Sequence, residues 1–347
     1  MTPTLSAYRP AAGLPLALTL MAALAACSAA PPAPPPAPPV DIPAPPEKPD
    51  EQPRVDQAAL RRERAESARA ANDRAKAAAV TPASIGMRSY LTDIEETLIA
   101  RGRLRTDQGQ EIAISPEKLT DDFIEIALHD EYIRQGDKLV VRHAPAPLRR
   151  WQNPVQIRME FGDSVDTGQR SRDRTEIGNF AGRLQRISGH PVSLTGGSGN
   201  FTVLIVNEDE RRAIGPRLNS LVPGIPAKDV TALSELAPQN YCAVFAYSQG
   251  SGSVYAQAVA VIRAELPPRL RRSCMHEELT QGMGLANDSP RARPSIFNDD
   301  EEFAYLTRHD ELLLKILYDP RLRPGMTEAE ARPIVMQIAT ELLGTEV

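Results

Sequence analysis

Side chains able to do chemistry gather in one predicted helix, residues 269–285. Glu277 and Gln281 are four residues apart, so they lie about 40° apart on one helix face, with Glu278 beside them. His276 precedes a glutamate, as in the H-E-x-x-H zinc motif, but a threonine occupies the position of the second histidine. This excludes a zinc site of that spacing. Carboxylates on this face can serve as a general base, bind a hard cation or join a hydrogen-bonded polar cluster.

When the motif is started at Glu277 instead of His276, the segment has the spacing of the metzincin signature H-E-x-x-H-x-x-G-x-x-H/D. The chain resembles that peptidase superfamily over roughly residues 154–318. The corresponding residues are, in order, Glu277, Glu278, Gln281, Gly284 and Asn287. The resemblance places Glu278 at the general base, Gly284 at the end of the helix and the other three at the zinc ligands. Residues 294–297 fall where a metzincin has its Met-turn, with Phe297 in place of the methionine.

Departures from this pattern decide the metal chemistry that we expect. A zinc site needs imidazole or thiolate donors, whereas Gln281 and Asn287 offer amide oxygens. We therefore expect no zinc and no cofactor, and a hydrogen-bonded polar cluster in a cleft. Calcium or magnesium is the alternative, bound by oxygen donors of this motif with Asp288 and Asp299 or Asp300 nearby.

Three stretches of the C-terminal half, HEELTQGMGLANDSP, PSIFNDD and HDELLLKILYDPRLRPGM, look most like a bacterial lipoprotein family known as domain of unknown function 2927. That resemblance implies no activity, substrate or ligand. A site completed by His276 or His309 stays open as a further alternative. Thr307 and Asp310 have the spacing of a capping box, which makes His309 a residue of a helix N-terminus.

Apolar residues of the C-terminal half follow strand and helix periods in turn. Strands are predicted over residues 155–161, 201–206, 241–247 and 253–262, and helices over 175–188, 208–221, 269–285, 307–318 and 327–343. We expect an α+β fold over residues 151–347, with a metzincin-like mixed sheet, an active-site-type helix, C-terminal helices and an edge strand at 253–262. Residues 81–150 are expected to form a small helical or mixed subdomain.

The N-terminal part is predicted to be a targeting signal followed by a spacer. The apolar run at residues 11–26 is too short to span a bilayer, so residues 1–26 indicate a signal peptide. It ends in LAAC, which resembles a bacterial lipobox, and Cys27 is therefore the predicted lipidation site. Residues 27–53 hold 12 of the 32 prolines, a composition typical of an extended linker. Residues 54–80, rich in Ala, Arg and Glu, indicate a charged helical stalk or a disordered spacer.

Two cysteines remain once Cys27 is assigned to the lipid. Cys242 and Cys274 form an even pair in an oxidising compartment, so a disulfide is the simplest inference. Two unpaired buried thiols are the alternative.

Composition limits the class of partner. With 347 residues, 41% of them apolar, the chain can bury a full core, and its formal charge of -5 argues against a general nucleic-acid binder. We expect a lipid-anchored protein on the periplasmic side of the bacterial cell envelope, with a binding or scaffold role for a peptide or cell-wall ligand along the edge strand. The alternative is a metal-dependent peptidase with Glu278 as general base.

Overall fold

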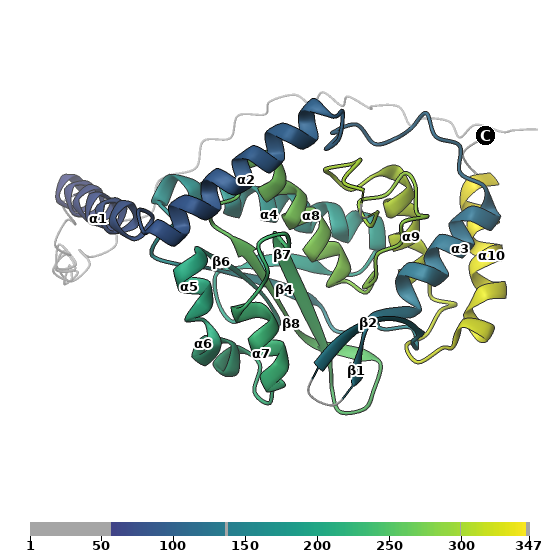
Figure 1. Ribbon diagram of the computed structural model, residues 1–347. Coiled ribbons are helices and arrows are strands. Elements are labelled where there is room, and N and C mark those ends of the chain that lie inside the picture. The colour runs from purple at the N-terminus through teal and green to yellow at the C-terminus, as the bar shows by residue number, and fades with distance from the viewer. Residues whose placement is uncertain (1–56, 136–137, 299, 345–347) are drawn as a thin grey trace, which may run out of the picture. The chain divides into compact units, whose positions relative to one another are not determined.

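The computed structural model describes residues 57–135, 138–298 and 300–344, which belong to one compact unit (Figure 1). The predicted signal peptide, Cys27 and the Pro-rich linker lie outside the described residues. None of the described helices combines the length and the apolar character that crossing a membrane requires.

A six-stranded, mostly parallel sheet forms the centre of this unit. Its strands are β3 (Arg150–Trp151), β4 (Val155–Phe161), β5 (Val192–Thr195), β6 (Phe201–Val206), β7 (Cys242–Ser248) and β8 (Val254–Arg263). Strands β5, β4, β6 and β8 are parallel neighbours in that order, and β3 pairs with the start of β8. Strand β7 pairs antiparallel with β8.

The edge of the sheet differs from our expectation. Residues 253–262 were predicted as an edge strand, but β8 lies between β6 and β7, so that prediction is wrong. The run Val259–Ala260–Val261–Ile262 is fully buried, which is typical of a central strand covered on both faces. The edge strand is β7, which pairs only with β8 among the described strands, and its residues are half-buried.

Alternate residues of the sheet enter two different cores. Phe201, Val203 and Ile205 of β6 belong to the large core, whereas Leu204 and Val206 belong to the smaller one. The large core also holds apolar residues of α4 (Thr167–Ser188), α8 (Pro268–Gln281) and α9 (Arg308–Tyr318). The smaller core is completed by α6 (Gly215–Leu221) and α7 (Ala227–Ser234). The fold is therefore mixed α/β with helices on both faces, and its mostly parallel sheet fits this class better than the predicted α+β class.

The N-terminal elements are α1 (Gln57–Ala78), α2 (Pro82–Ala100), α3 (Pro116–Ala127) and the hairpin of β1 (His129–Gln135) and β2 (Lys138–Pro145). Helices α2 and α3 add residues to the same large core. Leu91 of α2 and Phe123 of α3 lie in that core, so these two helices pack into the same core as the sheet. The last helix, α10 (Glu328–Gly344), packs on α3.

Local sequence signals account for most of the helix ends. Gly189 ends α4 in the left-handed conformation, and Asp166 caps its first turn. The single helix predicted over residues 208–221 is two, α5 (Glu208–Arg212) and α6. Pro216 explains the break, because proline is suited to the first turn of a helix and not to its interior.

Candidate functional site

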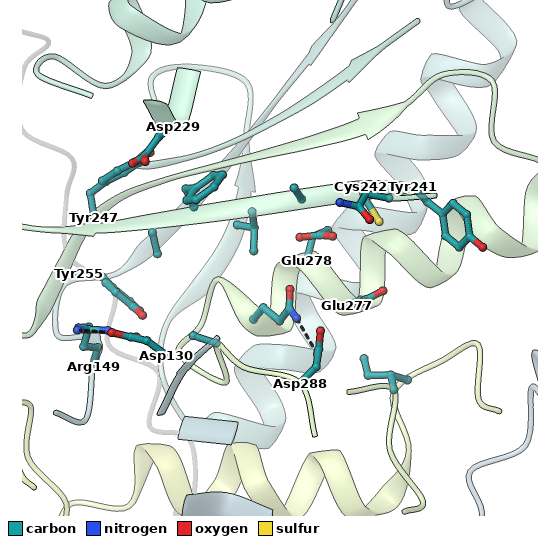
Figure 2. A pocket seen from close by; sticks show the side chains of 18 of the residues that line it. Asp130, Arg149, Asp229, Tyr241, Cys242, Tyr247, Tyr255, Glu277, Glu278 and Asp288 are labelled. Atoms are coloured by element: carbon teal, nitrogen blue, oxygen red, sulfur yellow. Dashed lines mark hydrogen bonds and ion pairs between the residues drawn. The ribbon is translucent and has the colours of Figure 1, made fainter. Parts of the chain in front are cut away.

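A cavity of about 910 Å³ lies between the edge strand β7 and helix α8 (Figure 2). It is called the cleft below. All of β7 and part of α8 line the cleft. Residues just before and just after Phe297 also line it, as do Asp130, Arg149 and Tyr255. Every consecutive residue of β7 lines the cleft, although neighbouring side chains of a strand point to opposite faces. The cleft therefore borders the edge of β7.

Helix α8 presents its polar residues to the cleft at helical spacing. Ser273, Glu277 and Gln281 follow one another at intervals of four residues, and Glu278 lies beside them. The Glu278 side chain is 3% exposed and lies between α8 and β7, whereas Glu277 is more accessible (Figure 2). The structure thus brings together three of the residues that the sequence placed on one helix face.

The residues after Gly284 separate into two groups. Asp288 lines the cleft, and the Gln281 side-chain amide donates a hydrogen bond to its Oδ1 at 3.0 Å. Asn287 is turned away: it is 2% exposed, and its side-chain amide donates to the Glu125 carbonyl at 2.8 Å. The expectation that Asn287 faces the cleft is corrected here, because its polar groups complete the end of α3.

Gly284 makes this separation possible. Its φ is +125°, and a Cβ at this position would lie 2.5 Å from the carbonyl oxygen of Arg149.

We expect Gly284→Ala to lower the free energy of unfolding by about 1 to 3 kcal/mol, because an L side chain strains this backbone conformation. Urea denaturation measures the effect. Gly86→Ala is the matched control, since Gly86 lies inside α2 with open space around it and its replacement is expected to stabilise the helix. Equal midpoints for Gly284→Ala and the wild type would contradict the prediction.

The donors near Glu278 do not fit zinc. Ligand atoms of Cys242, Glu277 and Glu278 lie within 4.8 Å of one another. However, Cys242 is joined to Cys274 by a disulfide with Cα atoms 6.0 Å apart, so its sulfur is not a thiolate. The described lining holds no histidine, and two carboxylates remain as the charged donors.

Both histidines considered from the sequence lie outside the cleft lining. His276 is 2% exposed on another face of α8, and its Nδ1 accepts a hydrogen bond from the Leu306 amide. Burial lowers the pKa of His276 to about 4. His309 follows Thr307, whose capping box with Asp310 is confirmed, and its fully buried ring contacts Asp122.

The cleft is acidic. Its ionisable lining residues include six carboxylates and one arginine: Asp130, Asp229, Glu277, Glu278, Asp288, Glu301 and Arg149. Arg149 forms an ion pair with Asp130 at 2.6 Å, which leaves the carboxylates in excess. Burial raises the pKa of Tyr241 to about 12, and the negative charges of Glu301 and Glu277 add to the shift. This field favours a cationic ligand.

Sequence reasoning missed the elements that complete the cleft. Asp130 and Arg149 come from segments that carry no motif, and Tyr247 hydrogen-bonds Asp229 at the end of β7. One signal in the sequence does distinguish the edge strand: residues 258–262 are uniformly apolar or small, whereas 241–248 include two tyrosines, a cysteine and a serine. A uniformly apolar run favours the centre of a sheet.

Comparisons with known proteins identify one family that matches the chain. No curated protein and no solved structure matches the chain. The family described as "protein of unknown function (DUF2927)" matches residues 116–337, well over half of the chain, from α3 to the middle of α10. This range includes the whole sheet and every residue that lines the cleft. The chain belongs to the DUF2927 family.

Proposed function

We propose that the protein binds an extended peptide with a cationic group in the cleft, and that it does so as a lipid-anchored protein of the cell envelope. The observation that carries this proposal is the position of β7, an edge strand bordering a cleft with an excess of carboxylates. A peptide laid against β7 would gain main-chain hydrogen bonds, as in β-strand addition. Its cationic group would lie near Glu277 and Asp288.

The spacing of polar residues in α8, which resembles the metzincin signature, supports the same mode of binding. An antiparallel edge strand beside a cleft, with a helix of the signature spacing below it, is the arrangement in which metzincin clefts hold extended substrates. Gln281 and Cys242 are engaged in a hydrogen bond and a disulfide, so the positions next to Glu278 serve structure instead of zinc binding. As a general base, Glu278 would act on a water molecule polarised by a bound metal ion, and the donors next to it do not fit zinc. A binding role fits these donors better than peptide hydrolysis.

The predicted lipidation site supports the envelope location in this proposal. LAAC at residues 24–27 resembles a lipobox, and the 12 prolines after it are typical of an extended spacer. We propose that a lipid on Cys27 holds the domain at a membrane and that the spacer carries the cleft towards envelope peptides, including the peptide part of the cell wall.

Fluorescence anisotropy with extended peptides tests the binding mode. Peptides with one central lysine are expected to bind the full-length protein, and norleucine in its place is expected to weaken binding. The variant Glu277→Gln/Asp288→Asn should weaken lysine-peptide binding about tenfold, the sum of two modest ion pairs. Glu96→Gln is the matched control, because Glu96 is exposed on α2 and outside the cleft lining.

A backbone control separates strand addition from simple charge attraction. N-methylation of alternate peptide residues removes the hydrogen-bond donors along one edge of the ligand. We expect one of the two methylation registers to abolish binding and the other to retain it. Equal binding of both methylated forms would contradict strand addition, and cleavage that Glu278→Gln abolishes would replace the binding role with peptidase activity.

A further inference from the structure

A second cavity, of about 500 Å³, lies against another face of α8 and is separate from the cleft. It is called the arginine pocket. Its polar lining residues are Thr106, Gln108, Arg183, Arg272, His276 and Tyr305. Arg272 and His276 are four residues apart on α8, and the cleft residues Ser273 and Glu277 are each one position later. The same helix therefore lines two cavities, on faces about 100° apart.

The wall of the arginine pocket is held by main-chain hydrogen bonds. The amide of Arg105 donates to the Glu302 carbonyl, and the amide of Ala304 donates to the Arg105 carbonyl, both at 2.8 Å. The amide of Arg308 then donates to the Gln108 carbonyl at 3.3 Å. These bonds fix the loop that carries Thr106 and Gln108 against the segment before α9, so the pocket is built before any ligand enters.

His276 presents a hydrogen-bond donor to this pocket. Its Nδ1 accepts from the Leu306 amide at 3.1 Å, so the ring hydrogen of the neutral imidazole is on Nε2. Within the described part of the chain, Nε2 has no hydrogen-bond partner, and Glu176 Oε1 lies 3.5 Å away. The ring stacks on Phe180 with centroids 4.0 Å apart, which fixes its direction. Glu176 Oε1 is thus the nearest acceptor, but it also pairs with Arg272, so the Nε2–H makes only a long contact and a ligand oxygen can complete it.

Two arginines supply positive charge beside this donor. Arg183 uses Nε and Nη2 for Glu311 and the Leu306 carbonyl, so its Nη1 makes no hydrogen bond to the described residues. Arg272 places Nε 2.7 Å from Glu176 and its guanidinium over the Tyr305 ring at 4.4 Å. Both guanidiniums are thus held in place by carboxylates outside the pocket lining, Glu311 and Glu176, which offset part of their charge, and the lining itself holds no carboxylate among the described residues.

We propose that the arginine pocket binds a small oxyanion, a carboxylate or phosphate group, through Arg183, Arg272 and the Nε2–H of His276. Arginine side chains present planar sets of N–H donors that match these anions. The hydroxyls of Thr106 and Tyr305 and the amide of Gln108 can complete the anion's remaining acceptor sites. This pocket contrasts with the acidic cleft, and its ligand is independent of the peptide proposed there.

Nitrogen NMR of the histidine rings tests the proposal on the full-length protein labelled with ¹⁵N-histidine. Inorganic phosphate and acetate are titrated separately at pH 7 and constant ionic strength, and His276→Gln identifies the His276 signals. We expect a saturable shift of the Nε2 signal with at least one of the two anions. Arg272→Met should weaken this binding about tenfold or more through loss of a charge-assisted hydrogen bond. Arg272 is the chosen position because its side chain is 45% exposed.

Arg186→Met is the matched control, since Arg186 is an exposed residue of α4 three positions after Arg183. The anion affinity of this variant should stay within about twofold of the wild type, because Arg186 does not line the pocket and an exposed charge is screened by salt. Saturation by one anion and not by the other would name the ligand class. Absence of a saturable shift with both anions would overturn the proposal, as would equal weakening by Arg186→Met and Arg272→Met, which would place the anion on the outer surface of α4.

Discussion

Replacing both cysteines of the disulfide, Cys242→Ala/Cys274→Ala, is expected to lower the free energy of unfolding by about 3 to 4 kcal/mol. The bridge closes a loop with a sequence separation of 32 residues, and cross-linking a loop of this length removes chain entropy from the unfolded state. Cys274 is 1% exposed, so truncating it adds a small loss of packing. Urea denaturation of the full-length protein, with and without a phosphine reductant, measures the change.

The reductant provides the internal control. It should destabilise the wild type by a similar amount and leave the double variant unchanged. Reductant sensitivity that persists in the double variant would point to Cys27, the remaining cysteine. Equal stability of the reduced and oxidised wild type would contradict a stabilising role for the bridge.

This disulfide also links the structure to the proposed function. It joins β7, the edge strand, to α8, the helix that carries Glu277 and Glu278. Because the cleft lies between these two elements, the bridge limits how far they can separate. We therefore expect the peptide affinity to fall together with the stability when the bridge is removed.

The helix face of the cleft was predictable from the sequence because it depends on local geometry alone. Glu277, Glu278 and Gln281 share a turn of one helix, and the 3.6-residue period fixes their relation before any tertiary contact forms. Beyond Gly284 that relation is lost. Whether Asn287 or Asp288 enters the cleft depends on a carbonyl of α3, more than 150 residues earlier in the chain, and spacing within a motif does not encode such a contact.

The same distinction explains the error at the edge of the sheet. Residues of β7 and β8 were both recognised as strands from their side chains, but strand order depends on which neighbour each strand pairs with. Two cores on opposite faces make a central strand apolar along its whole length, and β8 meets that criterion better than β7. The class of the fold was therefore partly predictable, whereas the strand that borders the cleft was not assigned correctly.

A buried histidine ties α3 to α9 and gives the last prediction. His309 Nε2 lies 2.9 Å from Asp122 Oδ2, and its Nδ1 lies 3.7 Å from Asp310 Oδ1. Lys118 of α3 also contacts Asp122, and Asp310 accepts hydrogen bonds from Ser295 and from its own capping partner. From the sequence, His309 was predicted as a residue of a helix N-terminus and kept as an alternative site residue, and its contact with α3 was outside the reach of the capping pattern.

The charge state of His309 makes this contact pH-dependent. Burial lowers the pKa of His309, but the hydrogen bond to Asp122 and the nearby negative charge of Asp310 oppose burial, and the net result is a pKa above its ordinary value of 6.5. A histidine whose pKa is raised by folding stabilises the folded state fully at pH values below 6.5. That contribution is lost as the pH rises through the folded-state pKa, because the proton that the fold favours is then released.

We expect Asp122→Ala to lower the free energy of unfolding by about 3 kcal/mol or more at pH 6, since it removes one partner of a buried ion pair. The loss should be smaller at pH 9, because raising the pH favours release of the proton from His309. Asp121→Ala is the matched control: Asp121 is the preceding residue of α3, its side chain is 64% exposed, and its ion pair with Arg332 should contribute about 0.5 kcal/mol with little change over this pH range. Urea denaturation at both pH values measures these losses. An equal loss for Asp122→Ala at pH 6 and pH 9 would contradict the prediction, because it would show that packing, and not the charged histidine, holds α3 against α9.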